Sequence, residues 1–373
     1  MTSILTNVGA ISALQTLRSI NSDMATAQGR VSSGLRVQYA ADNAAYWSIA
    51  TTMRSENMVL SAVSDSIGLA QAIADTAYAA LDTVVEHLDA MKSLFVSARS
   101  MEPVDITDFS YYSSTYFPDA GAEKRVDPKY AGSLLHKLDV DMLQHIMAIN
   151  SAVDSASFNG VNLLAKPKDG VDLDDAIAAK FVVGYAQGDV QKLNVASRDL
   201  VLFNANYASY GTVAETENNT GILDGDINIK AQMPDGSWWW TSAPIDIFNS
   251  TIFDESHDNV GISVIYDLES VIQLSGFTRD SAYDHFLNEF DQKIQSVVSA
   301  QAKLGSVQHR LEMAGDFNFT LMDAYTSGIG RLVDADMSEE STRLKALETQ
   351  QQLGIQALQI ANSNSENVLA LFR

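Results

Sequence analysis

Residues 4–31, ILTNVGAISALQTLRSINSDMATAQGRV, decide how this chain folds. The apolar residues of this stretch recur every three or four positions, a spacing that places them along one side of an α-helix. They are Ile4, Val8, Ile11, Leu14, Leu17, Ile20, Met24, Ala27 and Val31. Ala, Ser, Thr, Asn and Gln fill most of the other positions, and charged side chains are few. The stretch therefore predicts a long helix with one continuous apolar seam.

A second seam lies at the other end of the chain. Its members, two of them polar, are Leu344, Leu347, Gln351, Ile355, Leu358, Ala361, Ser365, Leu369 and Phe372. The spacing of both seams is close to a heptad repeat and predicts that the two ends pair as a coiled coil, either antiparallel or parallel. We refer to these two stripes as the terminal seams.

The faces outside the terminal seams are polar but hardly charged, whereas solvated helix faces are commonly rich in Glu and Lys. A two-helix rod of about 30 residues spans roughly 45 Å and buries only one side of each helix. One interpretation is a plain intramolecular hairpin. The other is that the outer faces also contact identical subunits, and such contacts build helical filaments when they do not close into a ring.

The middle of the chain differs from both ends. All six prolines lie between positions 103 and 244, and proline costs about 3 kcal/mol in a helix interior, so both ends are free to form long helices. Apolar stripes within residues 77–98, 134–153 and 286–311 predict a helical bundle. Residues 181–203 predict a β-hairpin, and short alternating runs, among them 261–266, predict strands.

The predicted fold is mainly α, with long terminal coiled-coil helices, a helical bundle with a β-hairpin, and a small β-rich inserted outer domain. The sequence divides into three parts on this interpretation. They are an inner layer of residues 1–44 and 334–373, a bundle layer of residues 45–205 and 276–333, and an outer domain of residues 206–275.

Composition excludes several classes of function. The chain of 373 residues carries a net charge of −23, which repels nucleic acids and acidic membrane surfaces. It has no cysteine, which excludes disulfides and thiolate chemistry, and no apolar run of about 20 residues that could span a membrane. No Lys or Arg precedes Arg18, so a secretory signal is not expected. The chain is expected to stay in the cytoplasm or to leave by a route that ignores such signals.

No catalytic, metal or cofactor site is predicted. The six histidines do not form an H-E-x-x-H motif, and neither a phosphate-binding loop nor a G-x-S-x-G elbow occurs. His145 lies beside an apolar stripe and is interpreted as a half-buried helix residue, and residues 172–175 as a solvated acidic turn. The aromatic loop 109–117 could bind carbohydrate, contact another subunit or pack on its own bundle. Of the three consecutive residues Trp238–Trp240, at least one should be exposed, because strand side chains alternate.

Four motifs resemble the signatures of bacterial flagellins. Residues 30–37 (RVSSGLRV), followed by 40–45 (AADNAA), are similar to the amino-terminal signature of that family. Residues 157–164 (SFNGVNLL) resemble the segment that leads out of its second helix. Residues 334–337 (DADM) and 366–373 (ENVLALFR) are similar to its approach to the last helix and to its carboxyl terminus. The motifs occur in the family's order at both ends of the chain.

The resemblance implies a structural subunit that self-assembles into the flagellar filament and transmits motor torque for swimming. It implies partners: further copies of the chain, other flagellins, the flagellar export apparatus, an export chaperone, the filament cap and hook-junction proteins. It also implies an extracellular location, reached without a cleaved signal peptide, and no cofactor. The terminal seams are then the assembly surfaces. Two alternatives stay open, a hook–filament junction protein and a secreted adhesin or glycan-binding protein.

The resemblance also points to two degenerate receptor epitopes. Where the family's plant epitope usually has Lys-Asp-Asp, residues 41–43 read Ala-Asp-Asn. In the stretch that resembles the animal receptor patch, Leu88 and Leu94 flank Ala90, which stands where an arginine is usual. Loss of a bidentate arginine at an interface can cost about 2 kcal/mol or more.

We therefore expect weak recognition by both receptor types. Dose–response assays of the purified monomer on receptor-bearing plant and animal cells measure this. Robust stimulation at nanomolar dose would contradict the prediction.

Overall fold

A computed structural model describes residues 7–106, 128–166, 177–186, 188–204, 221–224, 227, 229–240, 245, 247–248 and 264–370. The aromatic loop 109–117 and the acidic turn 172–175 lie outside these residues. The described part is mainly α, as predicted, with four small pairs of strands. It divides into two compact units, residues 1–62 with 317–373, and residues 63–316. These units do not test the three predicted layers, whose boundaries stay a prediction.

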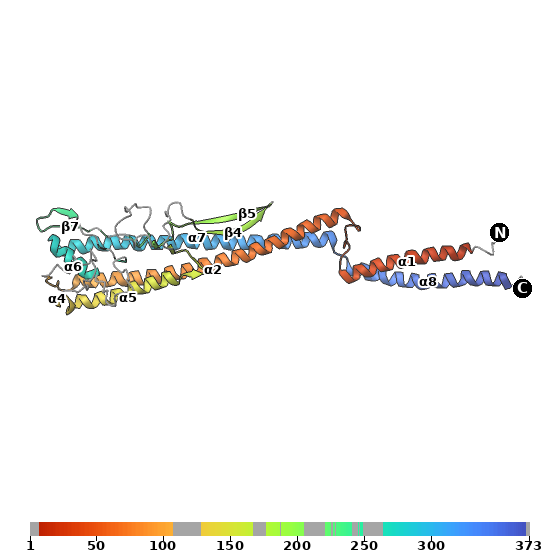
Figure 1. Ribbon diagram of the computed structural model, residues 1–373, viewed down its shortest axis with the longest axis horizontal. Coiled ribbons are helices and arrows are strands. Elements are labelled where there is room, and N and C mark those ends of the chain that lie inside the picture. The colour runs from red at the N-terminus through yellow and green to blue at the C-terminus, as the bar shows by residue number, and fades with distance from the viewer. Residues whose placement is uncertain are drawn as a thin grey trace, which may run out of the picture. The chain divides into compact units, whose positions relative to one another are not determined.

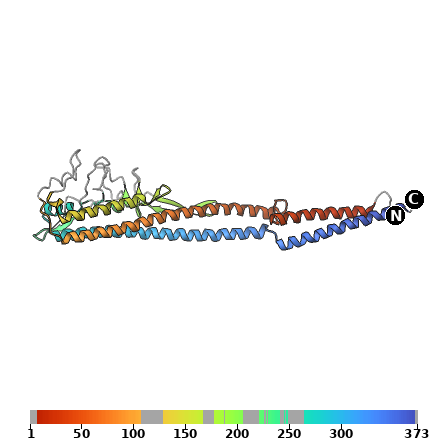
Figure 2. The same cartoon turned by 90° about the horizontal axis from the view of Figure 1, so that it is seen from below.

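The first unit contains the two ends of the chain. Helices α1 (Val8–Ser33) and α8 (Met337–Ala370) lie side by side and antiparallel (Figures 1 and 2). The side-chain oxygen of Asn7 accepts the N–H of Ala10 at 3.0 Å and caps the start of α1. Gly34 ends the helix at φ 72°, a left-handed conformation that glycine adopts without a steric penalty.

The segment after α1 is held against the end of α7 (Arg279–Val333). The N–H groups of Arg36 and Val37 donate to the carbonyl of Val333 at 2.7 and 3.2 Å, and Val37, Ala50 and Val333 form a small core. The Asp42 carboxylate accepts the N–H groups of Gln38 and Tyr39, and these bonds lower its pKa. This turn leads directly into α2 (Ala44–Ser100).

The second unit is a helical bundle with one large core. The parts of α2 and α7 in this unit pack with α5 (Leu134–Ser155), and the short helices α4 (Pro128–Ala131) and α6 (Val264–Ser275) belong to it as well. The rings of Phe95 and Phe286 meet edge to face, with centroids 4.7 Å apart. The predicted bundle is therefore present.

Two details of the bundle correct the sequence interpretation. The run 261–266 was expected to be a strand, but Val264 to Tyr266 form the first turn of α6. Val264, Ile265 and Tyr266 are all buried, and a short run of consecutive buried residues has no period that distinguishes a strand from a helix. The stripe in 134–153 was expected to include Leu134, which is 62% exposed, whereas Leu135 is buried.

Strands form short pairs beside the helices. The predicted hairpin is β4 (Ile177–Ala186) with β5 (Asp189–Ala196), but its return strand is shorter than expected. Phe203 and Asn204 form β6, which pairs in parallel with β3 (Ala165–Lys166). β1 (Ser157–Phe158) and β2 (Val161–Asn162) are joined by Asn159 and Gly160, both at positive φ, as a tight hairpin turn requires.

The last pair joins β7 (Lys230–Gln232) to β8 (Trp238–Trp240). All three tryptophans of β8 are more than half exposed, at 56%, 62% and 61%. The expectation that at least one is exposed is confirmed.

Asp139 is a carboxylate at a core position of α5. It is 2% exposed and accepts the Tyr130 hydroxyl at 2.5 Å. It also accepts the first-turn N–H groups of α6, from Ile265 at 2.8 Å and Tyr266 at 3.1 Å. The carboxylate thus caps α6 and links it to α4 and α5. Burial nevertheless raises the pKa of Asp139 to about 7.

This pKa makes stability depend on pH. The unfolded chain titrates Asp139 near 3.9, so between about pH 4 and 7 the folded state holds one more proton, and its stability falls as the pH rises. We expect the unfolding free energy of the wild type, relative to Asp139→Asn, to fall by on the order of 3 kcal/mol across this range. Urea unfolding of both proteins at each pH measures it. A constant difference would contradict the prediction.

Candidate assembly site

The interface between α1 and α8 follows a strict heptad pattern. Apart from Arg30, which pairs with Glu340, the residues of α1 that lose exposure recur in alternating steps of three and four, and so do those of α8. They are Ala10, Ala13, Leu17, Ile20, Met24, Ala27 and Val31 on α1, and Glu340, Leu344, Leu347, Gln351, Gly354, Leu358 and Ala361 on α8. We call these two sets the hairpin interface. Their average spacing of 3.5 residues keeps one side of each helix facing the other.

Polar contacts fix the antiparallel register of the hairpin. At one end, Asn7 Nδ2 donates to the carbonyl of Ala361 at 2.8 Å. In the middle, Gln351 Nε2 donates to Asn21 Oδ1 at 2.7 Å, so this polar member of the predicted seam is paired. At the other end, Arg30 Nη1 lies 2.9 Å from Glu340 Oε1. The Glu340 side chain is 9% exposed and Arg30 28%, so the pair is largely removed from water.

Gly354 takes the position that the sequence interpretation gave to Ile355. Ile355 is 43% exposed. A Cβ on Gly354 would lie 3.0 Å from Leu17 Cδ1, so the absence of a side chain makes room for Leu17. The prediction counted apolar residues and therefore passed over the glycine. Steps of four and then three residues from Leu347 lead through Gln351 to position 354. Continuing this spacing would have placed Gly354, and not Ile355, in the interface.

Three residues of the predicted amino-terminal seam lie outside the hairpin interface. Val8, Ile11 and Leu14 are 74%, 52% and 38% exposed. Val8, Ile11, Leu14 and Leu17 are three residues apart, and each step of three falls about 60° short of a full helical turn. Leu17 faces α8, so the residues before it point progressively away from α8. The seam is therefore not continuous within one chain.

Most of the other residues of the predicted terminal seams lie in the hairpin interface. Leu17, Ile20, Met24, Val31, Leu344, Leu347 and Leu358 belong to the hairpin interface. Leu369 belongs to α8, and Ile4 and Phe372 lie outside the described residues. A role of these residues between subunits stays a prediction.

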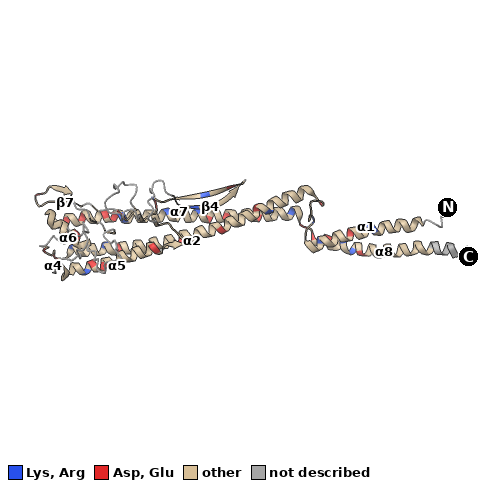
Figure 3. Cartoon of the chain, in the orientation of Figure 1, with Lys and Arg blue, Asp and Glu red and all other residues tan. Residues whose placement is uncertain are grey.

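The hairpin leaves several large apolar side chains exposed. Among the 26 residues of α1, Ala27 alone is buried. On α8, Leu353 and Ile360 are 59% and 62% exposed. Charged side chains are few on α1, and on α8 they gather in the first twelve residues (Figure 3). Val8, Ile11, Leu14, Leu353 and Ile360, which we call the outer apolar residues, are thus neither covered within the chain nor shielded by charge.

The residues of the predicted degenerate receptor patch are only partly exposed to solvent. Leu88 is fully buried in the bundle core, Leu94 is half-buried against it, and Ala90 is half-buried. Lys92, between them in sequence, pairs with Asp291 at 2.6 Å. Leu88 is therefore a core residue in the folded chain.

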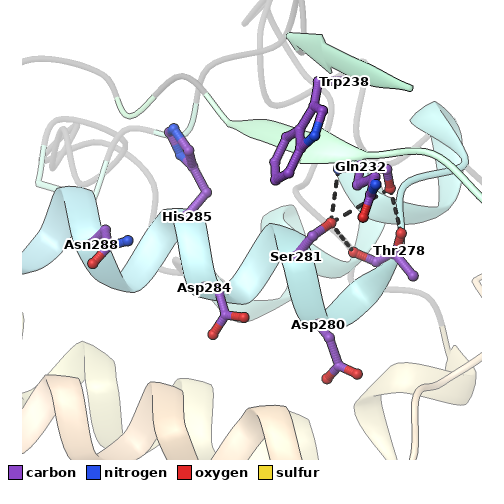
Figure 4. A pocket seen from close by; sticks show the side chains of 8 residues that line it. All are labelled: Gln232, Trp238, Thr278, Asp280, Ser281, Asp284, His285 and Asn288. Atoms are coloured by element: carbon purple, nitrogen blue, oxygen red, sulfur yellow. Dashed lines mark hydrogen bonds between the residues drawn. The ribbon is translucent and has the colours of Figure 1, made fainter. Parts of the chain in front are cut away.

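A shallow polar pocket lies between β8 and the first turns of α7. Trp238 leans over Ser281, while Asp280 and Asp284 point away from it (Figure 4). Most of its polar groups already have partners within the fold. Ser281 Oγ accepts the Gln232 N–H at 2.9 Å, and Arg99 pairs with both aspartates. Over the residues that the structure describes, no three His, Asp or Glu side chains gather as metal ligands would, and no helix has the length and hydropathy of a membrane span.

The two ends of the chain form a helical hairpin with a heptad interface and exposed apolar side chains, and a helical bundle lies between them in sequence; this arrangement fits a subunit of a helical polymer. Comparison with known proteins gives the family. Residues 4–109 match the bacterial flagellin N-terminal helical region, and residues 287–372 match the bacterial flagellin C-terminal helical region. The chain belongs to the bacterial flagellin family and is a structural subunit of the flagellar filament.

Relatives match along their whole length. The chain is 38% identical to flagellin C and 35% identical to flagellin A of Rhizobium meliloti (strain 1021), with all of each chain covered. It is 32% identical to a flagellin of Brucella melitensis biotype 1, again over the whole of both chains. These matches support neither the hook–filament junction protein nor the adhesin.

The hairpin interface can be tested with buried charges. Leu17→Asp and Leu358→Asp each place a carboxylate in the interface, at a cost of several kcal/mol unless the group is protonated. We expect neither variant to form filaments, while the bundle of the second unit still folds. Electron microscopy after seeding and circular dichroism measure the two outcomes. Normal filaments from either variant would contradict the interface.

Proposed function

We propose that the outer apolar residues are the surface through which copies of this chain pack in the filament. The observation that carries the proposal is their exposure, which reaches 74% at Val8 and 62% at Ile360. Apolar area of this kind is stabilised by about 25 cal/mol per Å² when it is buried against a neighbour. The few charges on α1 and on the part of α8 after Glu348 support close approach of identical chains, since like charges would repel.

We further propose that the filament transmits motor torque as propulsion. A subunit held through long helices at both chain ends resists bending and extension, because each helix is a continuous hydrogen-bonded rod. The pairing of α1 with α8 supports this role, since it ties the first and last elements of each subunit together. Family membership supports the same mechanical role over an enzymatic one, and we propose that the chain has no catalytic activity.

Delivery of the subunit is the third part of the proposal. Export in an unfolded state through the flagellar apparatus, with a chaperone and without a cleaved signal, is what membership of the flagellin family supports. Polymerisation beneath a filament cap and attachment through hook-junction proteins follow from the same resemblance. The similarity to two separate flagellins of one Rhizobium strain supports co-assembly with other flagellins.

Replacing an outer apolar residue by a charged one tests assembly without disturbing the folding of the monomer. Ile11 is 52% exposed, so Ile11→Asp should change the monomer's unfolding free energy by no more than about 0.5 kcal/mol. Polymerisation should fail, because the carboxylate would be buried between subunits without a partner. Thermal unfolding of the monomer and sedimentation of seeded polymer measure the two effects.

The matched control is Ile11→Val, which keeps an apolar side chain and should polymerise as the wild type does. If Ile11→Asp also polymerises normally, this face of α1 does not carry the subunit contact.

A further inference from the structure

Two histidines from different helices meet at the edge of the bundle. His87 of α2 and His145 of α5 place their Nδ1 atoms 3.0 Å apart, with ring centroids at 5.2 Å and the planes tilted by 50°. Both residues are half-buried, and each is followed in sequence by a fully buried core residue, Leu88 or Ile146. The helices that carry them are therefore fixed by packing, while the imidazoles remain accessible to water and ions.

The two nitrogens share a hydrogen bond, and their 3.0 Å separation is also short enough for both to bind one ion once the proton has left. Imidazole nitrogens bind divalent metals at about 2.0–2.1 Å, so two of them 3.0 Å apart subtend roughly 91–97° at a shared ion. A tetrahedral ion needs about 109°, which would require a separation of roughly 3.3–3.4 Å. Angles near 90° are those of tetragonal and square-planar sites with nitrogen and oxygen ligands, which Cu²⁺ and Ni²⁺ prefer.

The surroundings favour a cation. Asp141 precedes His145 by one helical turn and so lies on the same face of α5, and the whole chain carries a net charge of −23. Within the described residues no third His, Asp or Glu completes a ligand group with this pair. The remaining coordination positions would be filled by water.

We propose that His87 and His145 form a two-histidine site for Cu²⁺, and more weakly for Ni²⁺, that clamps α2 to α5. Binding replaces two waters of the hydrated ion by the two Nδ1 atoms. The proton held between the rings in the metal-free pair moves to an Nε2 atom, so each ring coordinates in its neutral form. A metal bound to the folded pair but not to the separated helices stabilises the bundle by mass action.

The test is a Cu²⁺ titration of the full-length monomer, followed by electron paramagnetic resonance and thermal unfolding. We expect one tight equivalent whose hyperfine splitting reports two imidazole nitrogens, and an unfolding temperature that rises when Cu²⁺ or Ni²⁺ is in excess. His87→Gln and His145→Gln should each weaken Cu²⁺ binding by about a hundredfold, because the second ligand then no longer acts intramolecularly.

His309→Gln is the matched control, since this exposed histidine lies 3.5 Å from Glu312 on α7 and should leave the titration unchanged. The proposal is overturned if both Gln variants bind Cu²⁺ as the wild type does. A wild-type spectrum with one imidazole nitrogen or none also overturns it, and this readout does not depend on the variants folding. Filament formation is a separate assay, so failure here leaves the assembly surface untouched.

Discussion

The packing of the first helix against the last is the contact that brings the two ends of the chain together. It joins segments that are more than 300 positions apart in sequence, as the Arg30–Glu340 and Asn21–Gln351 pairs show. Such distant contacts carry a large loop-closure cost, and their interface buries little of α1. On the assembly surface proposed above, neighbouring subunits would supply the remaining burial, and folding of the chain ends would be linked to assembly.

The helical bundle differs from the hairpin because its hydrophobic core is buried within one chain. Buried polar groups there specify which elements meet. Asp139 selects the start of α6. Arg279 donates to the carbonyls of Ala98, Arg99 and Met101 at the end of α2 and pairs with the buried Glu269. Each interaction satisfies backbone groups at a helix end that would otherwise be orphaned. The bundle is thus self-sufficient where the hairpin is not.

Sequence periodicity was reliable for long elements and weak for short ones. The helices at both ends and the three bundle stripes follow from repeated spacing, because burial of one face imposes that spacing over many turns. The β-hairpin follows from an apolar run that ends in a glycine-containing turn. α6 was missed as a helix because it is short and its first three residues, Val264 to Tyr266, are all apolar, so the start of the helix shows no helical period. Asp139 was missed as a core residue because a carboxylate is normally solvated, and only its three donors make the position tenable.

The sequence by itself determined that this chain has two apolar helical ends, a helical middle and the motifs of a flagellin. The tertiary structure decided which residues of each stripe face inward. Gly354 and not Ile355 opposes Leu17, and Val8, Ile11 and Leu14 turn to the outside. The reason is physical: a stripe records which residues are apolar, whereas the facing partner, its register and the space it leaves select which of them are covered.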